Sequence, residues 1–302
     1  MRILNILGKD VPIKDYWCSD GTAYYPRTDG KLWLYVNITD VCCGSCPFCI
    51  NPGRRSGSSP FDIGRFRTCL GLIRDHVYGV SLTGGEPMLE PELVDAVLGA
   101  VREVFGREEI DLVTNGTAFD RLLRLENLVS LHSVHVSRHR LSDEDNDALF
   151  GFHTLTWEEL RQAAERLDDP GALVLNCLLM KGGIETLDQA ADYLERASSA
   201  GVRMVSFIGM SRCNPFCEEH YLDPFRLAFG EDRRFHIWSR YADHEFCGCM
   251  SGSYRAEAGS IRFYVRGMGS RPTPCARQLV YTEDNRLLAG FGGEPIAVFG
   301  SR

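Results

Sequence analysis

Six short strand-like segments alternate with helical segments in this sequence, and this alternation limits the possible folds more than any other feature. Each segment is rich in β-branched or other apolar residues and is bounded by glycine, polar or charged residues. The six segments are residues 32–39, 79–85, 109–116, 133–140, 172–180 and 202–210. Strands separated by helices pair in parallel through right-handed crossovers. Six units are fewer than the eight of a closed barrel, so we predict an α/β fold with a partial (β/α)6 TIM-type barrel over residues 31–210.

The segments between these strands carry helix signals. Residues 91–105 place apolar side chains on one face at helical spacing. Residues 156–168 and 186–200 each begin with a capping box, in which a Thr at the start is followed three residues later by Glu or Gln. We therefore predict helices at these three places.

The regular alternation stops after the sixth strand. Residues 211–302 contain five cysteines, several aromatic residues and a predicted strand pair, 260–267 and 278–291, of which the second has its own turn at residues 283–285. We predict a small C-terminal α+β subdomain in this region. Residues 1–30 are expected to form an N-terminal extension.

The charge balance and the apolar runs exclude several classes of partner. The 302 residues include 33 Lys and Arg against 41 Asp and Glu, for a formal net charge of −8. A net-acidic chain is a poor candidate for phosphate contacts, so we expect no nucleic-acid partner. No apolar run is long enough for a membrane helix, and the first residues lack the layout of a signal peptide. We therefore expect a cytoplasmic protein with no membrane partner.

Twelve cysteines are many for a chain of this kind. Thiols stay reduced in the cytoplasm, which argues against a disulfide framework and in favour of metal ligation or thiol chemistry. Cys69 and Cys177 lie inside apolar segments, where cysteine commonly serves as a small buried hydrophobic residue. The other cysteines are candidates for chemistry.

Three cysteines lie in the loop after the first predicted strand. Cys42, Cys46 and Cys49 have the spacing C-x3-C-x2-C, at the end of a barrel strand where such folds place their active sites. Three thiolates can hold three irons of a [4Fe–4S] cluster and leave the fourth iron without a protein ligand. A structural zinc site is the alternative, but it needs four ligands, and no Cys or His follows soon after Cys49. Cys43 has the wrong spacing to replace Cys42.

This loop resembles the cluster-binding loop of the radical S-adenosylmethionine (radical SAM) superfamily, with Phe48 in the aromatic position of C-x3-C-x-aromatic-C. The resemblance implies that the open iron chelates the amino and carboxylate groups of S-adenosylmethionine. One electron then cleaves this cofactor to methionine and a 5′-deoxyadenosyl radical, which takes a hydrogen atom from the substrate. The cofactor carries the difficult chemistry, and the protein positions and shields it.

Polar residues at the ends of the following strands support the resemblance. The second strand ends in Gly-Gly-Glu-Pro, similar to the GGEP motif of the family, although a plain glycine turn would also fit. By resemblance, backbone carbonyls and Glu86 suit the amino group of the cofactor, a Ser bonds its ribose, and Arg138 or Arg140 pairs with its carboxylate. The expected cofactor-binding residues are Phe48, Gly84, Gly85, Glu86, Pro87, Asn115, Ser137, Arg138, Arg140 and Asn176.

The C-terminal region resembles the auxiliary-cluster modules of SPASM/twitch enzymes. The sequence from Cys275 to Phe291 is similar to their C-R-L-x-T-x-D-G-K-L-x-P-C pattern, but Ala289 and Gly290 stand where the pattern has its final Cys. This departure argues against a full SPASM domain with two auxiliary clusters, and it allows a single auxiliary cluster on three cysteines, as in the GTP cyclase of molybdenum-cofactor biosynthesis. The resemblance implies an auxiliary [4Fe–4S] cluster whose ligands are Cys247, Cys249 and Cys275.

Cys213 and Cys217 have the spacing C-x3-C and are open to two interpretations. One of them supplies a fourth ligand to the auxiliary cluster, or one of them donates a hydrogen atom to a substrate radical and the pair is catalytic. Zinc on the C-terminal thiols and purely structural cysteines are the alternatives. Of three histidines near the fourth strand, only His139 is expected to point into the site. A second Gly-Gly-Glu-Pro at 292–295 lies outside the barrel units and is treated as coincidence.

The predicted function is a radical SAM enzyme that abstracts hydrogen from a small-molecule or peptide substrate in a biosynthetic pathway. A flavodoxin or ferredoxin is the expected electron donor. One alternative is a maturase or epimerase of a ribosomally made peptide with a Cys hydrogen donor. An alternative of another class is a non-catalytic zinc or iron–sulfur protein, which would leave the polar strand ends unexplained.

Overall fold

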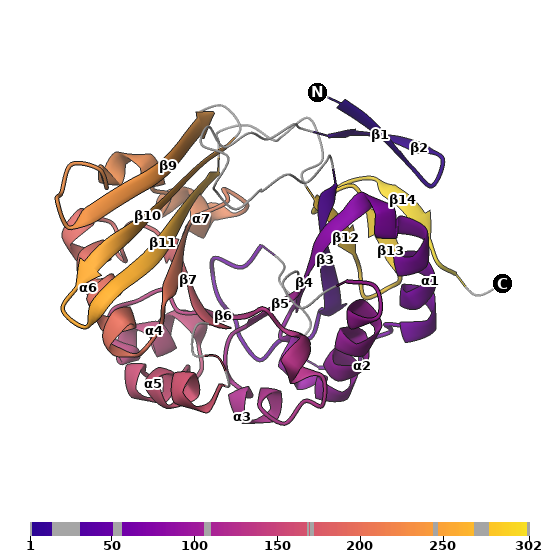
Figure 1. Cartoon of the computed structure of the whole chain (residues 1–302), viewed down its shortest axis with the longest axis horizontal. Helices are drawn as coiled ribbons and strands as arrows, with labels where there is room; N and C mark the ends of the chain where they lie inside the picture. Colours follow the sequence, from indigo (N-terminus) through magenta and orange to yellow (C-terminus); the bar gives the residue numbers. More distant parts are fainter. Residues whose placement is uncertain are drawn as a thin grey trace.

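The computed structural model describes residues 2–13, 31–50, 56–105, 110–167, 169, 172–243, 247–268 and 278–300. Within these ranges the chain forms one curved twelve-stranded sheet with helices on its outer side, and a separate two-stranded hairpin near the N-terminus (Figure 1). The strand order in the large sheet is β14-β13-β12-β3-β4-β5-β6-β7-β8-β11-β10-β9. This mixed α/β architecture confirms the predicted fold class.

The six predicted barrel strands are present in sequence order, and each pairs in parallel with the next. They are β3 (Leu32–Thr39), β4 (Val77–Gly84), β5 (Ile110–Thr114), β6 (Ser133–Ser137), β7 (Leu173–Leu179) and β8 (Met204–Gly209). Because these strands are parallel, their carboxyl ends all lie at the same end of the barrel. The loops that are predicted to carry the site begin at that end.

Helices cover the outer face of the curved sheet (Figure 1). They are α1 (Ile63–Ile73), α2 (Pro91–Arg102), α3 (Phe119–Leu122), α4 (Asp143–Phe150), α5 (Trp157–Arg166) and α6 (Leu187–Ser199), and the short α7 (Pro215–Glu219) follows β8. Both predicted capping boxes are formed, at Thr156 with Glu159 and at Thr186 with Gln189. Within the described part of the chain, no helix is both long and apolar enough to cross a membrane.

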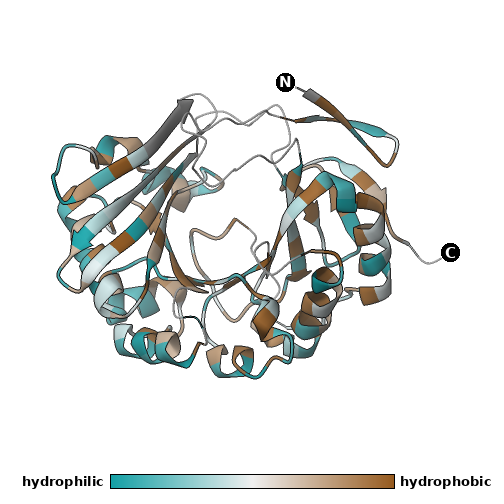
Figure 2. Cartoon of the chain, viewed as in Figure 1, coloured by the Kyte–Doolittle hydropathy of each residue, from teal (hydrophilic) through white to brown (hydrophobic). Residues whose placement is uncertain are grey.

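The core lies between the outer face of the sheet and these helices. Strands bury alternate residues on that face because successive side chains point to opposite sides. In β3 these residues are Leu34, Val36 and Ile38, all of them fully buried. In Figure 2 hydrophobic residues are frequent in the central strands, and the helices carry both hydrophobic and hydrophilic residues. The alternate residues on the inner face of the strands are not part of this core, so polar side chains can stand there.

The C-terminal strands extend the barrel sheet at both edges. At one edge β11 (Gly259–Met268) joins β8 in parallel, followed by the antiparallel β10 (Cys247–Ala256) and β9 (Phe235–Asp243). At the other edge β12 (Gln278–Tyr281) joins β3 in parallel, followed by the antiparallel β13 (Arg286–Leu288) and β14 (Pro295–Val298). The N-terminal residues form the hairpin of β1 (Arg2–Ile6) and β2 (Lys9–Ile13).

The predicted pairing of 260–267 with 278–291 is wrong. These segments lie at opposite edges of the sheet, as Figure 1 shows for β11 and β12. An open six-stranded sheet has two unpaired edges, and each C-terminal segment covers one of them. The turn at residues 283–285 is confirmed, because it joins the antiparallel pair β12 and β13. The division of the chain at residue 211 remains a proposal.

Asn285 fastens the β12–β13 turn to the barrel. Its backbone has φ of +63° and the residue is 2% exposed. Its Oδ1 accepts from Asp62 N at 2.9 Å and from the Tyr281 hydroxyl at 3.2 Å, and its Nδ2 donates to Pro60 O at 3.1 Å. The turn thus holds the segment that follows the predicted cysteine loop.

We expect Asn285→Ala to lower the free energy of unfolding by about 2–3 kcal/mol, because it removes buried hydrogen bonds and leaves an alanine at positive φ. Asn285→Gly is the matched control, since it removes the same bonds and relieves the backbone conformation, so its loss is smaller. Urea unfolding followed by circular dichroism measures both. Equal losses in the two variants would show that the positive φ carries no cost.

Candidate functional site

The cysteine loop, residues 40–50, begins where β3 ends and runs directly against the end of β4. Gly85 N donates to Thr39 O at 2.6 Å, and Glu86 N donates to Val41 O at 2.8 Å. A Cβ on Gly84 would collide with Thr39 O, and a Cβ on Gly85 would collide with Val41 O. Gly84 also has φ of +146°. Both glycines are therefore needed for the close approach of two backbones.

Phe48 anchors the loop in an aromatic cluster. Its ring lies 4.8 Å from that of His139 and 5.6 Å from that of Phe150, and these two rings stack at 5.1 Å. His139 is buried, and its Nδ1 accepts from Leu178 N at 3.2 Å. Burial lowers the pKa of His139 to about 3, so the ring is neutral. His139 therefore packs beneath Phe48 and supports the loop.

Three further segments hold the cysteine loop. Ser45 N donates to Phe150 O at 3.2 Å. Asn214 Nδ2, at the start of α7, donates to Pro47 O at 3.0 Å. Asp40 N donates to the Glu283 carboxylate at 2.7 Å. The end of α4, the start of α7 and the β12–β13 turn thus fix one loop from different sides.

The sulfurs of Cys42 and Cys46 face the same glycine. A Cβ on Gly44 would lie 3.6 Å from Cys42 Sγ and 3.2 Å from Cys46 Sγ, so a side chain there would occupy the space between them. Cys42 Sγ also accepts from Gly44 N at 3.3 Å. Within the described part of the chain, no three Cys, His, Asp or Glu side chains come together in a metal-binding arrangement. The structure brings two of the three predicted thiols together, and Cys49 follows on the same turn.

Cys43 points to the end of β5. Its sulfur accepts from Asn115 Nδ2 at 3.3 Å and lies 3.5 Å from the Thr117 hydroxyl. A hydrogen bond with Cys42, together with those from Thr117 and Asn115, lowers the pKa of Cys43 to about 5, while the same Cys42–Cys43 bond and burial raise the pKa of Cys42. The predicted cofactor contact Asn115 is therefore engaged with Cys43 here.

Glu86 is fully buried and bound by three donors of the protein. Its Oε1 accepts from Met88 N at 3.0 Å and from the Thr114 hydroxyl at 2.6 Å, and its Oε2 accepts from Asn115 N at 2.7 Å. Burial raises the pKa of Glu86 to about 7 against these hydrogen bonds. Pro87 follows as the buried first residue of a short 3-10 helix. In this arrangement Glu86 positions the end of β5.

Asn37 is a candidate that the sequence analysis missed. Its Nδ2 donates to Asp40 at 2.7 Å, whereas its Oδ1 is buried and has no hydrogen-bond partner among the described residues. That oxygen faces Gly84, since a Cβ there would lie 2.6 Å from it. A buried acceptor beside the Gly-Gly-Glu-Pro turn fits a donor group such as an ammonium. Its place on the inner face of β3 could have indicated it.

Ser137 and Asn176 are neighbours on β6 and β7 and share a polar inner face. Asn176 Oδ1 is bonded to His135 Nδ1 at 3.2 Å. Ser133 Oγ lies 2.8 Å from His135 Nε2 and donates to Asp111 at 2.7 Å. This chain of side chains orients Asn176 from below, and the sequence analysis missed it, because it expects only His139 of the three histidines to point into the site.

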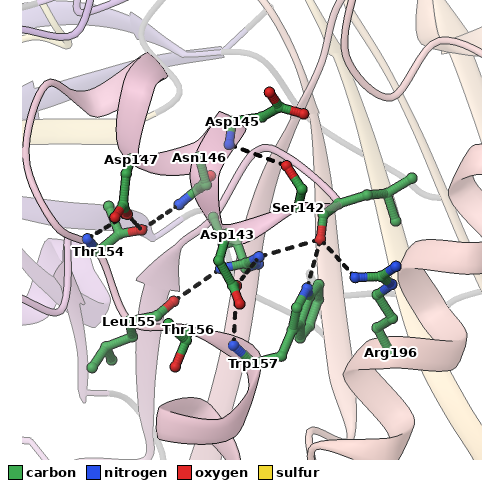
Figure 3. Close-up of polar contacts among 12 residues, drawn as sticks. Ser142, Asp143, Asp145, Asn146, Asp147, Thr154, Leu155, Thr156, Trp157 and Arg196 are labelled. Carbon is green, nitrogen blue, oxygen red and sulfur yellow. Dashed lines mark hydrogen bonds and ion pairs between the residues drawn. The ribbon is translucent and has the colours of Figure 1, made fainter.

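Arg138 lies away from the cysteine loop. Its guanidinium is 1% exposed, donates to Leu155 O at 2.9 Å and to Leu141 O at 3.3 Å, and pairs with Asp143 at 2.6 Å. It also lies 4.3 Å from the centre of the Trp157 ring. Figure 3 shows Asp143, Leu155 and Trp157 meeting between α4 and α5. The structure therefore places Arg138 outside the predicted site, in a buried polar cluster behind the sheet.

Arg138 points away from the cysteine loop because successive side chains of a strand lie on opposite faces of the sheet. Ser137 faces the inner side of the sheet, so Arg138 points to the outer side with the buried Val134 and Val136. Arg140 is half-buried, donates to His139 O at 3.2 Å and lies against Gly183 in the loop after β7. Of the two predicted arginines, only Arg140 remains a proposal for a carboxylate contact.

The C-terminal cysteines are only partly described. Cys213 Sγ and Cys217 Sγ lie 3.6 Å apart, and burial raises the pKa of Cys217 to about 11. Cys249 is buried on β10. The side chain of Cys247 and all of Cys275 lie outside the described residues. The second Gly-Gly-Glu-Pro lies in the turn between β13 and β14.

A partial parallel barrel with its ligand-binding loops at the carboxyl ends of the strands defines a TIM-type barrel enzyme scaffold. The family model described as the Radical SAM superfamily matches residues 36–212, more than half of the chain. The chain belongs to this superfamily of enzymes.

Several curated proteins are similar to this chain. The GTP 3′,8-cyclase of Edwardsiella ictaluri is 29% identical over 284 residues, 88% of this chain and 82% of the relative. The GTP 3′,8-cyclase of Aquifex aeolicus is 27% identical over 191 residues, 60% of this chain and 58% of the relative. Molybdenum cofactor biosynthesis protein 1 of Bos taurus is 24% identical over 201 residues, 64% of this chain and 31% of the relative. The chain thus matches less than two thirds of the length of the last two.

Glu86 predicts a pH dependence of stability. Its pKa is raised from 4.5 to about 7 in the native state, so the native state binds more protons than the unfolded state between these values. The Glu86 contribution is therefore fully present below pH about 4.5 and is lost as the pH rises through about 7.

We expect the free energy of unfolding of the wild type, relative to Glu86→Gln, to fall by about 2–3 kcal/mol from pH about 5 to pH about 8. Urea unfolding of both proteins at several pH values measures the difference. A difference that is independent of pH would contradict the raised pKa.

Arg138→Met tests the placement of Arg138. It leaves Asp143 and two carbonyls without their buried partner, so we expect a loss of stability of about 3–5 kcal/mol. Arg140→Met is the matched control on a half-buried residue, with an expected loss of at most about 1 kcal/mol. Chemical unfolding of the two variants compares them. Normal stability of Arg138→Met would contradict this buried placement of Arg138 and leave it a candidate cofactor ligand.

Proposed function

We propose that this chain cleaves S-adenosylmethionine reductively at a [4Fe–4S] cluster held by Cys42, Cys46 and Cys49, and that it abstracts hydrogen from a small-molecule or peptide substrate in a biosynthetic pathway. The observation that carries the proposal is the cysteine loop, fixed by backbone contacts with Gly84 and Gly85 at the carboxyl ends of the strands. Membership of the superfamily supports the same chemistry.

The residues around the loop fit this cluster and cofactor. Three thiols on one short loop are the donor set that iron prefers, and two of the sulfurs already face the same space at Gly44. The cluster, when bound, supplies the electron that splits the cofactor. The unpartnered oxygen of Asn37 beside Gly84 fits an ammonium donor.

Residues on neighbouring strands would bind the rest of the cofactor. Ser137 and Asn176 lie side by side on the inner face and offer a hydroxyl and an amide to ribose. Arg140 is the proposed partner of the carboxylate. The buried Glu86 and the half-buried His135 act through Asn115 and Asn176, which they hold in place.

Further parts of the proposal concern electron transfer and substrate. Cys247, Cys249 and Cys275 are proposed to hold an auxiliary [4Fe–4S] cluster, and a flavodoxin or ferredoxin in the cytoplasm is proposed as the electron donor. The relatives named GTP 3′,8-cyclase make GTP the first small molecule to test as a substrate.

A second candidate is a peptide maturase or epimerase that returns a hydrogen atom from cysteine to the substrate radical. The specific observation in its favour is the pair Cys213 and Cys217, which lies against the cysteine loop through Asn214 and Phe48. Product analysis with GTP and with peptides would separate the two candidates.

Replacing Cys42, Cys46 or Cys49 with alanine should abolish cluster binding and cofactor cleavage, because each removes one of three iron ligands. The chain offers two controls: Cys43→Ala, one residue away in the same loop, and Cys69→Ala, buried on α1. Both should retain iron after anaerobic reconstitution.

Iron content and 5′-deoxyadenosine, formed with dithionite and S-adenosylmethionine, are the measurements. A wild-type protein that binds zinc and forms no 5′-deoxyadenosine would favour the non-catalytic alternative. Loss of iron in Cys43→Ala but not in Cys42→Ala would show that the ligand set is wrong.

A further inference from the structure

Cys213 and Cys217 form a close pair of thiols. Their sulfurs lie 3.6 Å apart, whereas a disulfide bond is about 2.05 Å long. The two cysteines flank Asn214, the residue that caps α7, and Asn214 Oδ1 accepts from Cys217 N at 2.9 Å. To form a disulfide, the two sulfurs would have to approach each other by about 1.5 Å.

The pair is fastened to the cysteine loop at the residues between Cys46 and Cys49. Asn214 Nδ2 donates to Pro47 O at 3.0 Å, and Cys217 Sγ lies 3.7 Å from Phe48 O. The dithiol therefore lies against the loop that is proposed to hold the cluster.

The two thiols differ in their surroundings. Cys217 is fully buried in a small apolar cluster with Met180 and Met210, against which Phe48 and Leu178 pack. Cys213 is exposed to solvent. The apolar side chains packed around Cys217 shield a sulfur radical from water, and an exposed thiol can release its proton to water.

We propose that Cys217 quenches a carbon-centred radical formed beside the cysteine loop, and that Cys217 and Cys213 are together oxidised to a disulfide. The proposal rests on the proposed function, because that function supplies the radical. The proposal goes beyond a single cysteine that donates hydrogen. The pair gives a hydrogen atom to the carbon radical and, on forming the disulfide, gives up one electron.

The atoms and electrons balance as follows. The S–H bond of Cys217 breaks and a C–H bond forms on the carbon radical. The Cys217 sulfur radical then bonds to the Cys213 sulfur, whose proton leaves to solvent. The surplus electron needs an acceptor, and the proposed [4Fe–4S] cluster would take it, since it would have given one electron to the cofactor; a disulfide remains.

This balance defines a reaction class. A substrate that regains hydrogen from Cys217 ends at its original oxidation level, as in inversion at a carbon that bears hydrogen. An external dithiol reductant must then reduce the disulfide after each turnover.

The test needs no known substrate, since the 5′-deoxyadenosyl radical is itself a carbon-centred radical. The full chain is loaded with iron and sulfide, transferred to D₂O and mixed with S-adenosylmethionine and dithionite. Thiol hydrogens exchange with D₂O, whereas carbon-bound hydrogens do not. We expect 5′-deoxyadenosine that carries one deuterium, and a Cys213–Cys217 disulfide that accumulates with it, detected by mass spectrometry after differential alkylation.

Three variants separate the roles of the thiols. In Cys217→Ala we expect the 5′-deoxyadenosine that forms to lose its label, and the disulfide to be absent. In Cys213→Ser the label persists and the disulfide is lost, because only the bonding partner is removed. Cys69→Ala, which removes an equally buried thiol far along the chain, is the matched control and keeps both signals.

Unlabelled 5′-deoxyadenosine from the wild type, or label that survives in Cys217→Ala, overturns Cys217 as the donor. Label without disulfide in the wild type overturns the pairing. Absence of 5′-deoxyadenosine from the iron-loaded wild type contradicts the proposed function and with it the radical. If Cys217→Ala does not fold by circular dichroism, Cys217→Ser takes its place, because it keeps the size of the side chain and lacks the S–H bond that donates the hydrogen atom.

Discussion

The close contact of two backbones, the end of β3 and the end of β4, determines the rest of this structure. Gly84 and Gly85 lie against Thr39 and Val41 so closely that no side chain fits between them. This contact starts the cysteine loop in a fixed direction. Phe48, α7 and the C-terminal hairpin then hold the loop from other sides. A loop of ten or so residues without regular structure is thereby fixed at the carboxyl ends of the barrel strands.

The barrel itself could be predicted from the sequence, because its strands and helices are short, regular and separated by clear boundaries. The β3 segment, 32–39, agrees with its predicted bounds, and the capping boxes at Thr156 and Thr186 mark real helix starts. Local hydrogen bonds and alternating burial determine these features. They need no knowledge of distant parts of the chain.

The site was harder to predict, because each side chain there depends on contacts between segments far apart in sequence. Strand alternation alone could have excluded Arg138, which follows an inward-facing Ser137 and therefore points behind the sheet. No local pattern shows that Glu86 is enclosed by Thr114 and Asn115. Nor does the SPASM/twitch-like pattern from Cys275 to Phe291 show that the hairpin in it pairs with β3. The pairing of β12 with β3 depends on which strand of the finished sheet still has an unpaired edge.

The place of β12 beside β3 has a consequence for the order of events during synthesis. Glu283 reaches the backbone of Asp40 from 243 residues further along the chain. The first barrel strand therefore keeps an uncovered edge, and the residues before Cys42 lack one of their supports, until the segment around Glu283 has left the ribosome. A nascent chain can assemble its central strands earlier, but its thiol-bearing loop gains full support only after the β12–β13 hairpin has been synthesised and has paired with β3.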